Sequence, residues 1–381
     1  MAIEKIHIEQ FLELAEQHPV IDVRSPAEYK HAHIPGAYSL PLFTDEERKV
    51  VGTTYKQESR EAAIKIALDY FGPKMKKMIG EVESLAKSQE WGVKNQNATN
   101  DSRLPTPNSR LILIYCWRGG MRSSGVAWLM DLYGFKVYTL VGGYKKFRNY
   151  VLDTFKLPFH CKILGGYTGS GKTELLKGLE KKGETIIDLE DIAKHKGSAF
   201  GNIGMPEQPG QEMFENLLAQ EIRRKVFFNK GSLLKKPETG NSHIWLEDES
   251  QRIGLVNIPN GLWNKMRCSS IFFVNIPFEE RLSHLVQEYG QLEKQKMIDA
   301  IGRIRERLGG LNTKIAIQLL QEGNIAESFR ILLRYYDKHY LKALHNRENI
   351  NSLLHTINCD SVTIENANIL VSQPQYHSEG P

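Results

Sequence analysis

The sequence lacks long hydrophobic runs, has few cysteines and carries little net charge. No stretch approaches the ~20 consecutive apolar residues of a membrane-spanning helix. Glutamates at positions 4, 9, 13 and 16 do not fit a signal or transit peptide. The four cysteines include no CxxC pair and are too few, in 381 residues, for a disulfide scaffold. We therefore expect a cytoplasmic protein with reduced thiols and no membrane contact.

The charge that is present is unevenly distributed. A net charge of +5 is too small to indicate a nucleic-acid partner by itself. Between residues 303 and 347, however, nine lysines and arginines stand against four acidic residues. This excess suits contact with a polyanion, but it also suits an ordinary solvated helix face. Both interpretations stay open at this point.

Two α/β patterns follow one another along the chain. In the first, apolar spacing predicts a helix over 61–88, and apolar runs predict strands at 20–23, 111–115 and 136–141. Strands that alternate with helices indicate a parallel sheet. We place this first α/β domain at residues 1–150.

The pattern restarts near Pro158. Apolar runs predict further strands at 160–164, 185–189, 243–246 and 270–275. From residue 279 onward the sequence turns mainly helical. We therefore expect a second α/β domain at 158–278, followed by a helical C-terminal region at 279–370.

One cysteine lies in a position suited to chemistry. Cys116 directly follows an apolar strand and precedes a predicted helix, in the segment Tyr-Cys-Trp-Arg-Gly-Gly-Met-Arg-Ser. Loop N–H groups and a helix N-terminus in this position stabilise a thiolate, and Arg118 and Arg122 add positive charge. The same surroundings would hold an anion attached to the sulfur, such as a persulfide, a perselenide or a phosphate. The alternative is a buried structural cysteine.

A second motif predicts phosphate binding. The segment Gly-Tyr-Thr-Gly-Ser-Gly-Lys-Thr at 166–173 fits G-x4-G-K-[ST] and lies between an apolar strand and a helix, as the motif requires. Glycines let backbone N–H groups surround phosphate oxygens, while Lys172 neutralises charge and Thr173 can ligate Mg2+. The predicted phosphate-binding residues are Gly166, Gly169, Ser170, Gly171, Lys172 and Thr173.

Acidic residues end two of the apolar runs in the second domain. Glu247, Asp248 and Glu249 follow one run, while Asp188 and Glu190 follow another. Either set could act as an acid, or hold Mg2+ or a water molecule beside bound phosphate. An acidic junction between strand and loop is also often merely solvated. We therefore predict no firm metal site.

The N-terminal segment resembles the rhodanese-homology family. Val-Ile-Asp-Val-Arg at 20–24 and His-Ile-Pro-Gly at 33–36 match the entry signature of that family. The resemblance implies a rhodanese-like parallel-sheet domain that transfers sulfur or selenium through Cys116. The common rhodanese loop has arginine five residues after the cysteine, whereas here Met121 holds that place and Arg122 follows. Because Cys-x5-Arg is also a loop of cysteine-dependent phosphatases, that activity stays an alternative.

From about residue 5 to 365, the chain is similar to the bacterial tRNA 2-selenouridine synthase family. The similarity rests on both loops, on Val-Gly-Gly-Tyr-Lys at 141–145 and on Glu-Asp-Glu-Ser at 247–250. It implies a transferase that converts wobble 2-thiouridine of tRNA to 2-selenouridine through S-geranyl-2-thiouridine. Its substrates would be geranyl diphosphate and selenophosphate, with no firm cofactor. The implied catalytic residues are Cys116, Arg118, Arg122 and Lys172.

The resemblance also implies a tRNA-binding surface on the helical C-terminal region. The candidates are its basic residues Arg303, Arg305, Arg307, Arg334 and Lys338. The tyrosines nearby, Tyr335, Tyr336 and Tyr340, could stack on an unpaired base or pack in a helical core. The alternatives are a rhodanese-type sulfurtransferase or Cys-x5-Arg phosphatase fused to a P-loop NTPase, and a non-catalytic tRNA-binding module.

Overall fold

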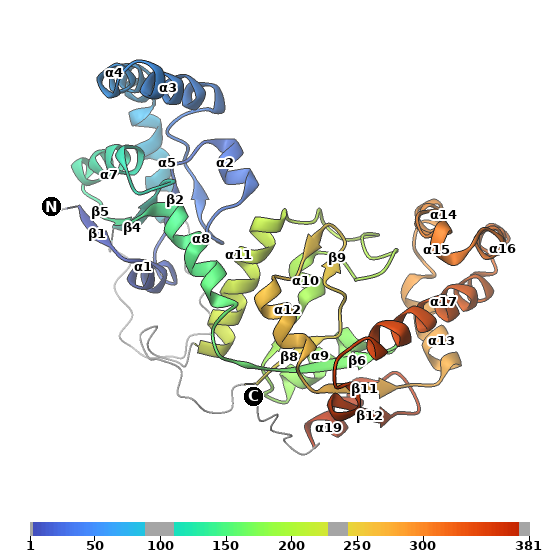
Figure 1. Ribbon diagram of the computed structural model, residues 1–381. Coiled ribbons are helices and arrows are strands. Elements are labelled where there is room, and N and C mark those ends of the chain that lie inside the picture. Colours follow the sequence, from blue (N-terminus) through green and yellow to red (C-terminus); the bar gives the residue numbers. More distant parts are fainter. Residues whose placement is uncertain (1–2, 88–109, 228–242, 373–381) are drawn as a thin grey trace. The chain divides into compact units, whose positions relative to one another are not determined.

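The computed structural model describes residues 3–87, 110–227 and 243–372, and the chain divides into two compact units (Figure 1). Among these residues the first unit ends at Thr154 and the second begins at Phe155. Each unit has its own five-stranded parallel sheet, so the predicted α/β class with parallel sheets is confirmed. The boundary between 278 and 279 stays a prediction. None of the described helices combines the length and apolar character needed to cross a membrane.

The first unit is a parallel sheet in the order β1-β5-β4-β2-β3. Its strands are β1 (Glu4–Ile6), β2 (Val20–Asp22), β3 (Tyr38–Ser39), β4 (Leu111–Tyr115) and β5 (Lys136–Leu140). Its helices are α1 (Ile8–Ala15), α2 (Pro26–His31), α3 (Asp45–Gln57), α4 (Arg60–Phe71), the 3-10 turn η1 (Gly72–Lys74), α5 (Met75–Lys87), α7 (Met121–Tyr133) and α8 (Gly143–Thr154). The central strands are buried, as continuous apolar runs in a parallel sheet predict.

The predicted helix over 61–88 is interrupted in the structure. It comprises α4, η1 and α5, and the break falls at Gly72 and Pro73. Proline lacks the N–H that a continuous helix needs and restricts the residue before it. The predicted helical segment is therefore confirmed over residues 61–87, with a break at Gly72 and Pro73 that the apolar spacing did not indicate.

The second unit has the sheet order β12-β11-β6-β8-β7. These strands are β6 (His160–Gly166), β7 (Ile186–Ile187), β8 (His243–Glu247), β11 (Ile271–Asn275) and β12 (Leu354–Asn358), and a separate antiparallel pair is formed by β9 (Arg252–Ile253) and β10 (Val256–Asn257). The nearby helices are α9 (Lys172–Lys181), α10 (Leu189–Ala193), α11 (Gln211–Ile222), the π-helical turn η2 (Arg223–Phe227) and α12 (Asn260–Arg267).

The C-terminal segment is helical, as predicted, but it also returns to the sheet. Its elements are α13 (Phe278–Tyr289), α14 (Lys294–Arg303), α15 (Arg305–Leu308), α16 (Gly310–Gln321), α17 (Ile325–His345), α18 (Ile350–Leu353), η3 (Ile364–Asn366) and α19 (Ala367–Val371). Helices α13 to α17 gather at one side of the second unit (Figure 1) and share an apolar core. Strand β12 pairs in parallel with β11 from Leu354 to Asn358, a strand that the sequence did not predict.

Candidate functional site

The cysteine loop lies at the carboxyl end of β4. Cys116 follows the strand, and α7 begins five residues later at Met121. The Gly120 N–H donates to Cys116 Sγ at 3.3 Å, and Ser123 Oγ lies 3.2 Å from the same sulfur. The side chain is only 3% exposed. A backbone N–H, a hydroxyl and the start of α7 therefore lie around the sulfur.

The two arginines of this loop differ in their surroundings. Arg118 is exposed, whereas Arg122 Nη1 donates to Glu28 Oε2 at 2.7 Å. Burial by itself would raise the pKa of Glu28, but the hydrogen bond and charge of Arg122 lower it to about 2. The positive charge of Arg122 is thus shared with a carboxylate. Its catalytic role, like that of Arg118, stays a prediction.

Asp22 and Arg24 form a buried ion pair near the cysteine loop. Arg24 Nη2 donates to Asp22 Oδ2 at 2.6 Å and to Ala32 O at 2.7 Å. The Arg24 guanidinium lies 3.9 Å from the centre of the Tyr144 ring. Gly143, the first residue of α8, has φ +58°, and a Cβ there would lie 2.3 Å from Cys116 O. Asp22 also accepts from Tyr115 Oη at 2.7 Å, and Tyr144 N donates to Cys116 O at 2.8 Å, so the ion pair and the start of α8 contact the residues at the start of the cysteine loop.

The phosphate loop lies at the carboxyl end of β6 and leads into α9. Gly169 and Gly171 have φ of +80° and +69°, and a Cβ on either would meet another segment at 2.9 Å or less. Glycine is therefore required at both positions. Lys172 Nζ lies 3.5 Å from Gly166 O, so the side chain folds back over the loop. Thr173 Oγ1 donates to Glu247 Oε1 at 3.0 Å.

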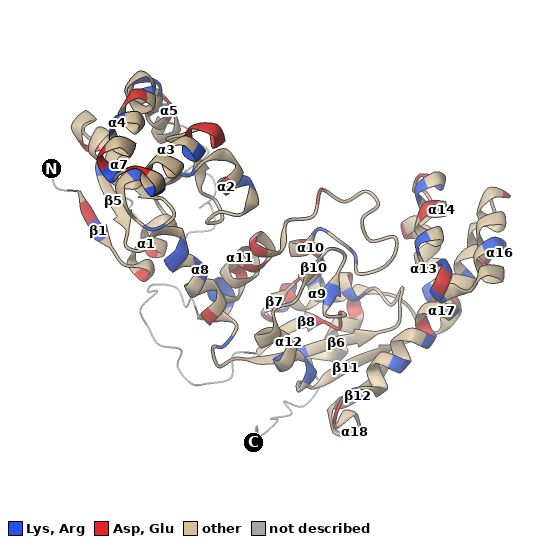
Figure 2. Cartoon of the chain, turned by 45° about the horizontal axis from the view of Figure 1, so that its top comes forward, with Lys and Arg blue, Asp and Glu red and all other residues tan. Residues whose placement is uncertain are grey.

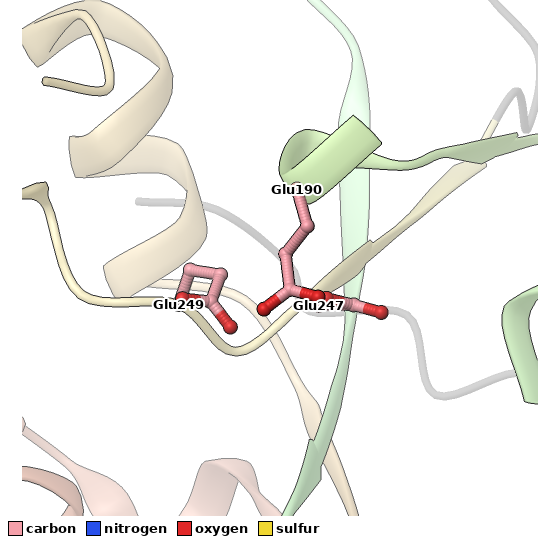
Figure 3. Close-up of side chains that lie close together, drawn as sticks. All are labelled: Glu190, Glu247 and Glu249. Atoms are coloured by element: carbon pink, nitrogen blue, oxygen red, sulfur yellow. The ribbon is translucent and has the colours of Figure 1, made fainter. Parts of the chain in front are cut away.

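Three glutamates meet beside this loop (Figure 3). One carboxylate oxygen from each of Glu190, Glu247 and Glu249 lies within 4.8 Å of the others. Burial, followed by the charges of the neighbouring carboxylates, raises the pKa of each to about 8. Their charge in turn outweighs desolvation and raises the pKa of Lys172. The cluster can therefore hold a proton or a cation.

The structure brings some of the predicted acids together and separates others. Glu247 and Glu249 join the cluster, since residues two apart in an extended segment lie on one face. Asp248 points elsewhere: it accepts from Tyr340 Oη at 2.7 Å and pairs with Arg347. Asp188 caps α10 by accepting from Asp191 N at 2.7 Å, and burial raises its pKa.

Helices α13 and α17 hold the phosphate loop in place. Arg281, which is 3% exposed, donates to Thr168 O at 3.0 Å and to both carboxylate oxygens of Asp337 at 2.9 and 2.8 Å. The Gly166 N–H donates to Tyr340 Oη at 3.3 Å. These contacts could not be predicted from local sequence patterns, because they join residues 174, 113 and 56 positions apart.

The phosphate loop opens into a cavity of about 750 Å³. One wall of this cavity is apolar and includes Phe200, Leu285, Tyr289 and Phe329. The rings of Phe200, Tyr289 and Phe329 lie 6.0 to 6.5 Å apart, centre to centre. Leu285 Cγ lies 2.9 Å from where a Cβ on Gly169 would be, so this apolar wall directly adjoins the phosphate loop.

The predicted tRNA-binding residues lie on the helices of the second unit. Arg303, Arg305, Arg307, Arg334 and Lys338 are all exposed. Figure 2 shows the basic segments of α14 and α17 to which Arg303, Arg334 and Lys338 belong. Arg303 Nη2 donates to Ala199 O at 2.9 Å, and Arg307 lines the cavity. Their role in binding RNA stays a prediction.

The tyrosines of α17 make contacts within the protein. Tyr336 Oη accepts from Ala199 N at 3.2 Å, and Tyr340 Oη bonds to both Gly166 and Asp248. Tyr335 lies against Tyr336, with ring centres 5.1 Å apart. Packing therefore accounts for Tyr336 and Tyr340, whose hydroxyl groups are already used in the fold.

A cysteine loop and a P-loop motif, each following a strand of its own parallel sheet, define a two-unit α/β protein. A family model described as a rhodanese-like domain matches residues 7–150. Another, described as the tRNA 2-selenouridine synthase AAA domain, matches residues 159–362. The chain belongs to the tRNA 2-selenouridine synthase family.

Three relatives named tRNA 2-selenouridine synthase support this assignment. The relative from Bdellovibrio bacteriovorus is 31% identical, over 91% of this chain and 94% of its own length. That from Hydrogenovibrio crunogenus is 35% identical, over 77% of this chain and 76% of its own. That from Aeromonas salmonicida is 32% identical, over 86% and 88%. The similarity thus extends over both units.

Proposed function

We propose that the protein is a tRNA 2-selenouridine synthase that acts on wobble 2-thiouridine in two steps. In the first, geranyl diphosphate alkylates the sulfur; in the second, selenium derived from selenophosphate replaces the geranylthio group. The names of the relatives support the overall activity. The observation that carries the first step is that a phosphate loop and an aromatic wall line one cavity, which suits a diphosphate with an apolar tail.

Alkylation needs stabilisation of a departing diphosphate. The thiocarbonyl sulfur forms a bond to C1 of the geranyl group, the C1–O bond breaks, and the nucleobase loses its ring N–H proton. Negative charge grows on the diphosphate, where the loop N–H groups and Lys172 would stabilise it. The geranyl chain would lie against Phe200, Leu285, Tyr289 and Phe329, away from water.

The residues beside the phosphate loop also suit Mg2+. Glu247 Oε2 is buried and has no hydrogen-bond partner among the described residues, and buried carboxylate oxygens without partners are costly. Thr173, Glu190, Glu247 and Glu249 supply the hard oxygen ligands that Mg2+ prefers. When bound, the ion would neutralise charge on the diphosphate. Because the three carboxyls have raised pKa values, they would release protons as the ion binds.

The second step requires a selenium nucleophile at C2 of the nucleobase. Alkylation turns the sulfur into a good leaving group, so the selenium of selenophosphate adds at C2 and geranylthiolate departs. Water then cleaves the Se–P bond and releases inorganic phosphate, and no oxidation state changes. Cys116 and its loop would bind and deliver the selenium-bearing donor. The loop N–H, the hydroxyl of Ser123 and the start of α7 favour an anion there.

Binding of tRNA completes the proposal. Arg303, Arg305, Arg307, Arg334 and Lys338 are exposed cations on the unit that carries the phosphate loop. Such residues would neutralise phosphates of the anticodon arm, and affinity would fall as salt rises.

The test uses purified protein, 2-thiouridine tRNA and both substrates, with nucleosides analysed by mass spectrometry. Lys172→Ala should abolish both products, because the first step feeds the second. Cys116→Ser should accumulate S-geranyl-2-thiouridine and form no 2-selenouridine. Cys268→Ser, at an exposed thiol outside both loops, is the matched control. Loss of both steps in folded Cys116→Ser would contradict this division, and unchanged tRNA with wild-type protein would favour a plain sulfurtransferase.

A further inference from the structure

A buried arginine in the cavity has donors that find no acceptor in the part of the chain that the structure describes. Arg347 follows α17, and its side chain is 3% exposed. It pairs with Asp248 through Nη2, but its Nε and Nη1 have no hydrogen-bond partner among the described residues. Burying guanidinium N–H groups without acceptors is costly. Since Arg347 lines the cavity, an acceptor supplied by a ligand would satisfy it.

A second arginine lies next to the first. Arg267, at the end of α12, lines the same cavity, and its guanidinium lies 5.7 Å from the centre of the Trp263 ring. Burial and then the charge of Arg347 lower the pKa of Arg267, although Asp248 opposes this. Glu348 also acts on Arg267 electrostatically, but Asp248 is the carboxylate that pairs with Arg347. An anion between the two arginines would relieve their repulsion.

The arginine pair is connected to the phosphate loop. Asp248, the partner of Arg347, accepts from Tyr340 Oη, which in turn accepts from the Gly166 N–H. The cavity therefore presents two separate positions for anions, linked by one carboxylate and one phenol. The loop suits a diphosphate, and the arginine pair suits one further phosphate.

We propose that Arg347 and Arg267 form a second anion subsite, which binds a backbone phosphate of the RNA substrate. This inference rests on the proposed function for the presence of RNA. Guanidinium groups offer the paired donors that phosphate oxygens accept. A nucleotide that brings its base to a diphosphate at the loop also brings its own phosphodiesters into the cavity. The Arg267 guanidinium itself lies over the Trp263 ring, a contact that helps to hold the arginine in place.

Binding of tRNA to the full chain tests the subsite separately from catalysis. For Arg267→Gln we expect roughly tenfold weaker tRNA binding, with the salt dependence of log K reduced by about one. Affinity for inorganic pyrophosphate, measured by calorimetry, should not change. Arg224→Gln removes the same charge from an exposed arginine paired with Glu221 and is the matched control.

The second variant is a conservative change at Arg347. A neutral replacement would leave Asp248 buried without its cation and could prevent folding. Arg347→Lys keeps a positive charge for Asp248 but loses the planar set of donors. It should weaken tRNA binding as Arg267→Gln does and retain pyrophosphate affinity, which reports an intact phosphate loop.

Two results would overturn the subsite. One is unchanged tRNA affinity and salt dependence in both variants. The other is weaker binding of inorganic phosphate or pyrophosphate with tRNA binding intact, which would assign the arginines to a free anion. Failure of the proposed function is distinct: wild-type protein would then form no 2-selenouridine. Wild-type protein that does not bind tRNA would refute both.

Discussion

At the scale of single residues, the three glutamates beside the phosphate loop make the stability of the protein depend on pH. Burial and mutual repulsion raise the pKa of Glu190, Glu247 and Glu249 to about 8, from a usual value of 4.5. Between these two values the folded chain holds protons that the unfolded chain has lost. The free energy of unfolding therefore decreases as pH rises through this window.

Replacing one of these carboxyls tests that consequence. In the absence of metal, the melting temperature of wild-type protein should fall as pH rises from about 4.5 to 8. The free energy of unfolding should decrease by ~1.4 kcal/mol per pH unit for each proton that the folded state retains. Glu249→Gln removes one titrating group and relieves the others, so its melting temperature should depend less on pH. Scanning calorimetry at a series of pH values measures this. Glu306→Gln, at an exposed position, is the control, and equal slopes in Glu249→Gln and wild type would refute the expectation.

The sequence predicted part of this cluster. Acids that end two apolar runs were recognised as possible ligands, and Glu247 and Glu249 do meet Glu190. The sequence could not show that the Asp248 side chain lies outside the cluster, because its partners Tyr340 and Arg347 are 92 and 99 residues further along the chain. Nor could the sequence reveal that two donors of Arg347 lack an acceptor within residues 3–87, 110–227 and 243–372. Side-chain partners of this kind are set by tertiary packing.

Among the elements, the two loops were the easiest to predict, because each has its motif, its strand and its helix in adjacent residues. Helices α2 and α3 were missed, although both begin with a capping box, Ser25 with Glu28 and Thr44 with Glu47. Strand β12 was missed because only two of its five residues, Leu354 and Ile357, are aliphatic and because it follows a long helical segment. Its pairing with β11 is a long-range contact that local patterns do not encode.

The start of α8 gives a test at this scale. Gly143→Ala would place a Cβ 2.3 Å from Cys116 O and 2.5 Å from Gly119 N, at φ +58°. The loop must move, at a cost of roughly 1–3 kcal/mol, so selenation should fall while geranylation persists. Nucleoside mass spectrometry measures both products. Gly120→Ala lies in the same loop with open space around its Cβ and retains the N–H toward sulfur, so it should be far milder; equal losses in the two variants would contradict the steric argument.

For the whole molecule, the division into two compact units predicts two unfolding events. Calorimetry should resolve two transitions, because each unit has its own sheet and core. Pyrophosphate should raise the melting temperature of the second unit only. At 100 times its dissociation constant it should add ~2.7 kcal/mol to the free energy of unfolding of that unit. Lys172→Ala should abolish that shift and leave the other transition in place. A single transition, or a shift of both by pyrophosphate, would show that the units unfold together.

The edge strand β12 has a consequence for how the protein is made. The sheet of the second unit begins with β6 at His160, yet its edge is completed only by β12 at Leu354. Shortly afterwards Val362 fits against the phosphate loop, where its Cγ1 lies 2.5 Å from a Cβ built on Gly171. A ribosome must therefore synthesise nearly all of this unit before the loop acquires its final surroundings. During translation, the first unit can fold before β12, the last strand of the second unit, has been synthesised.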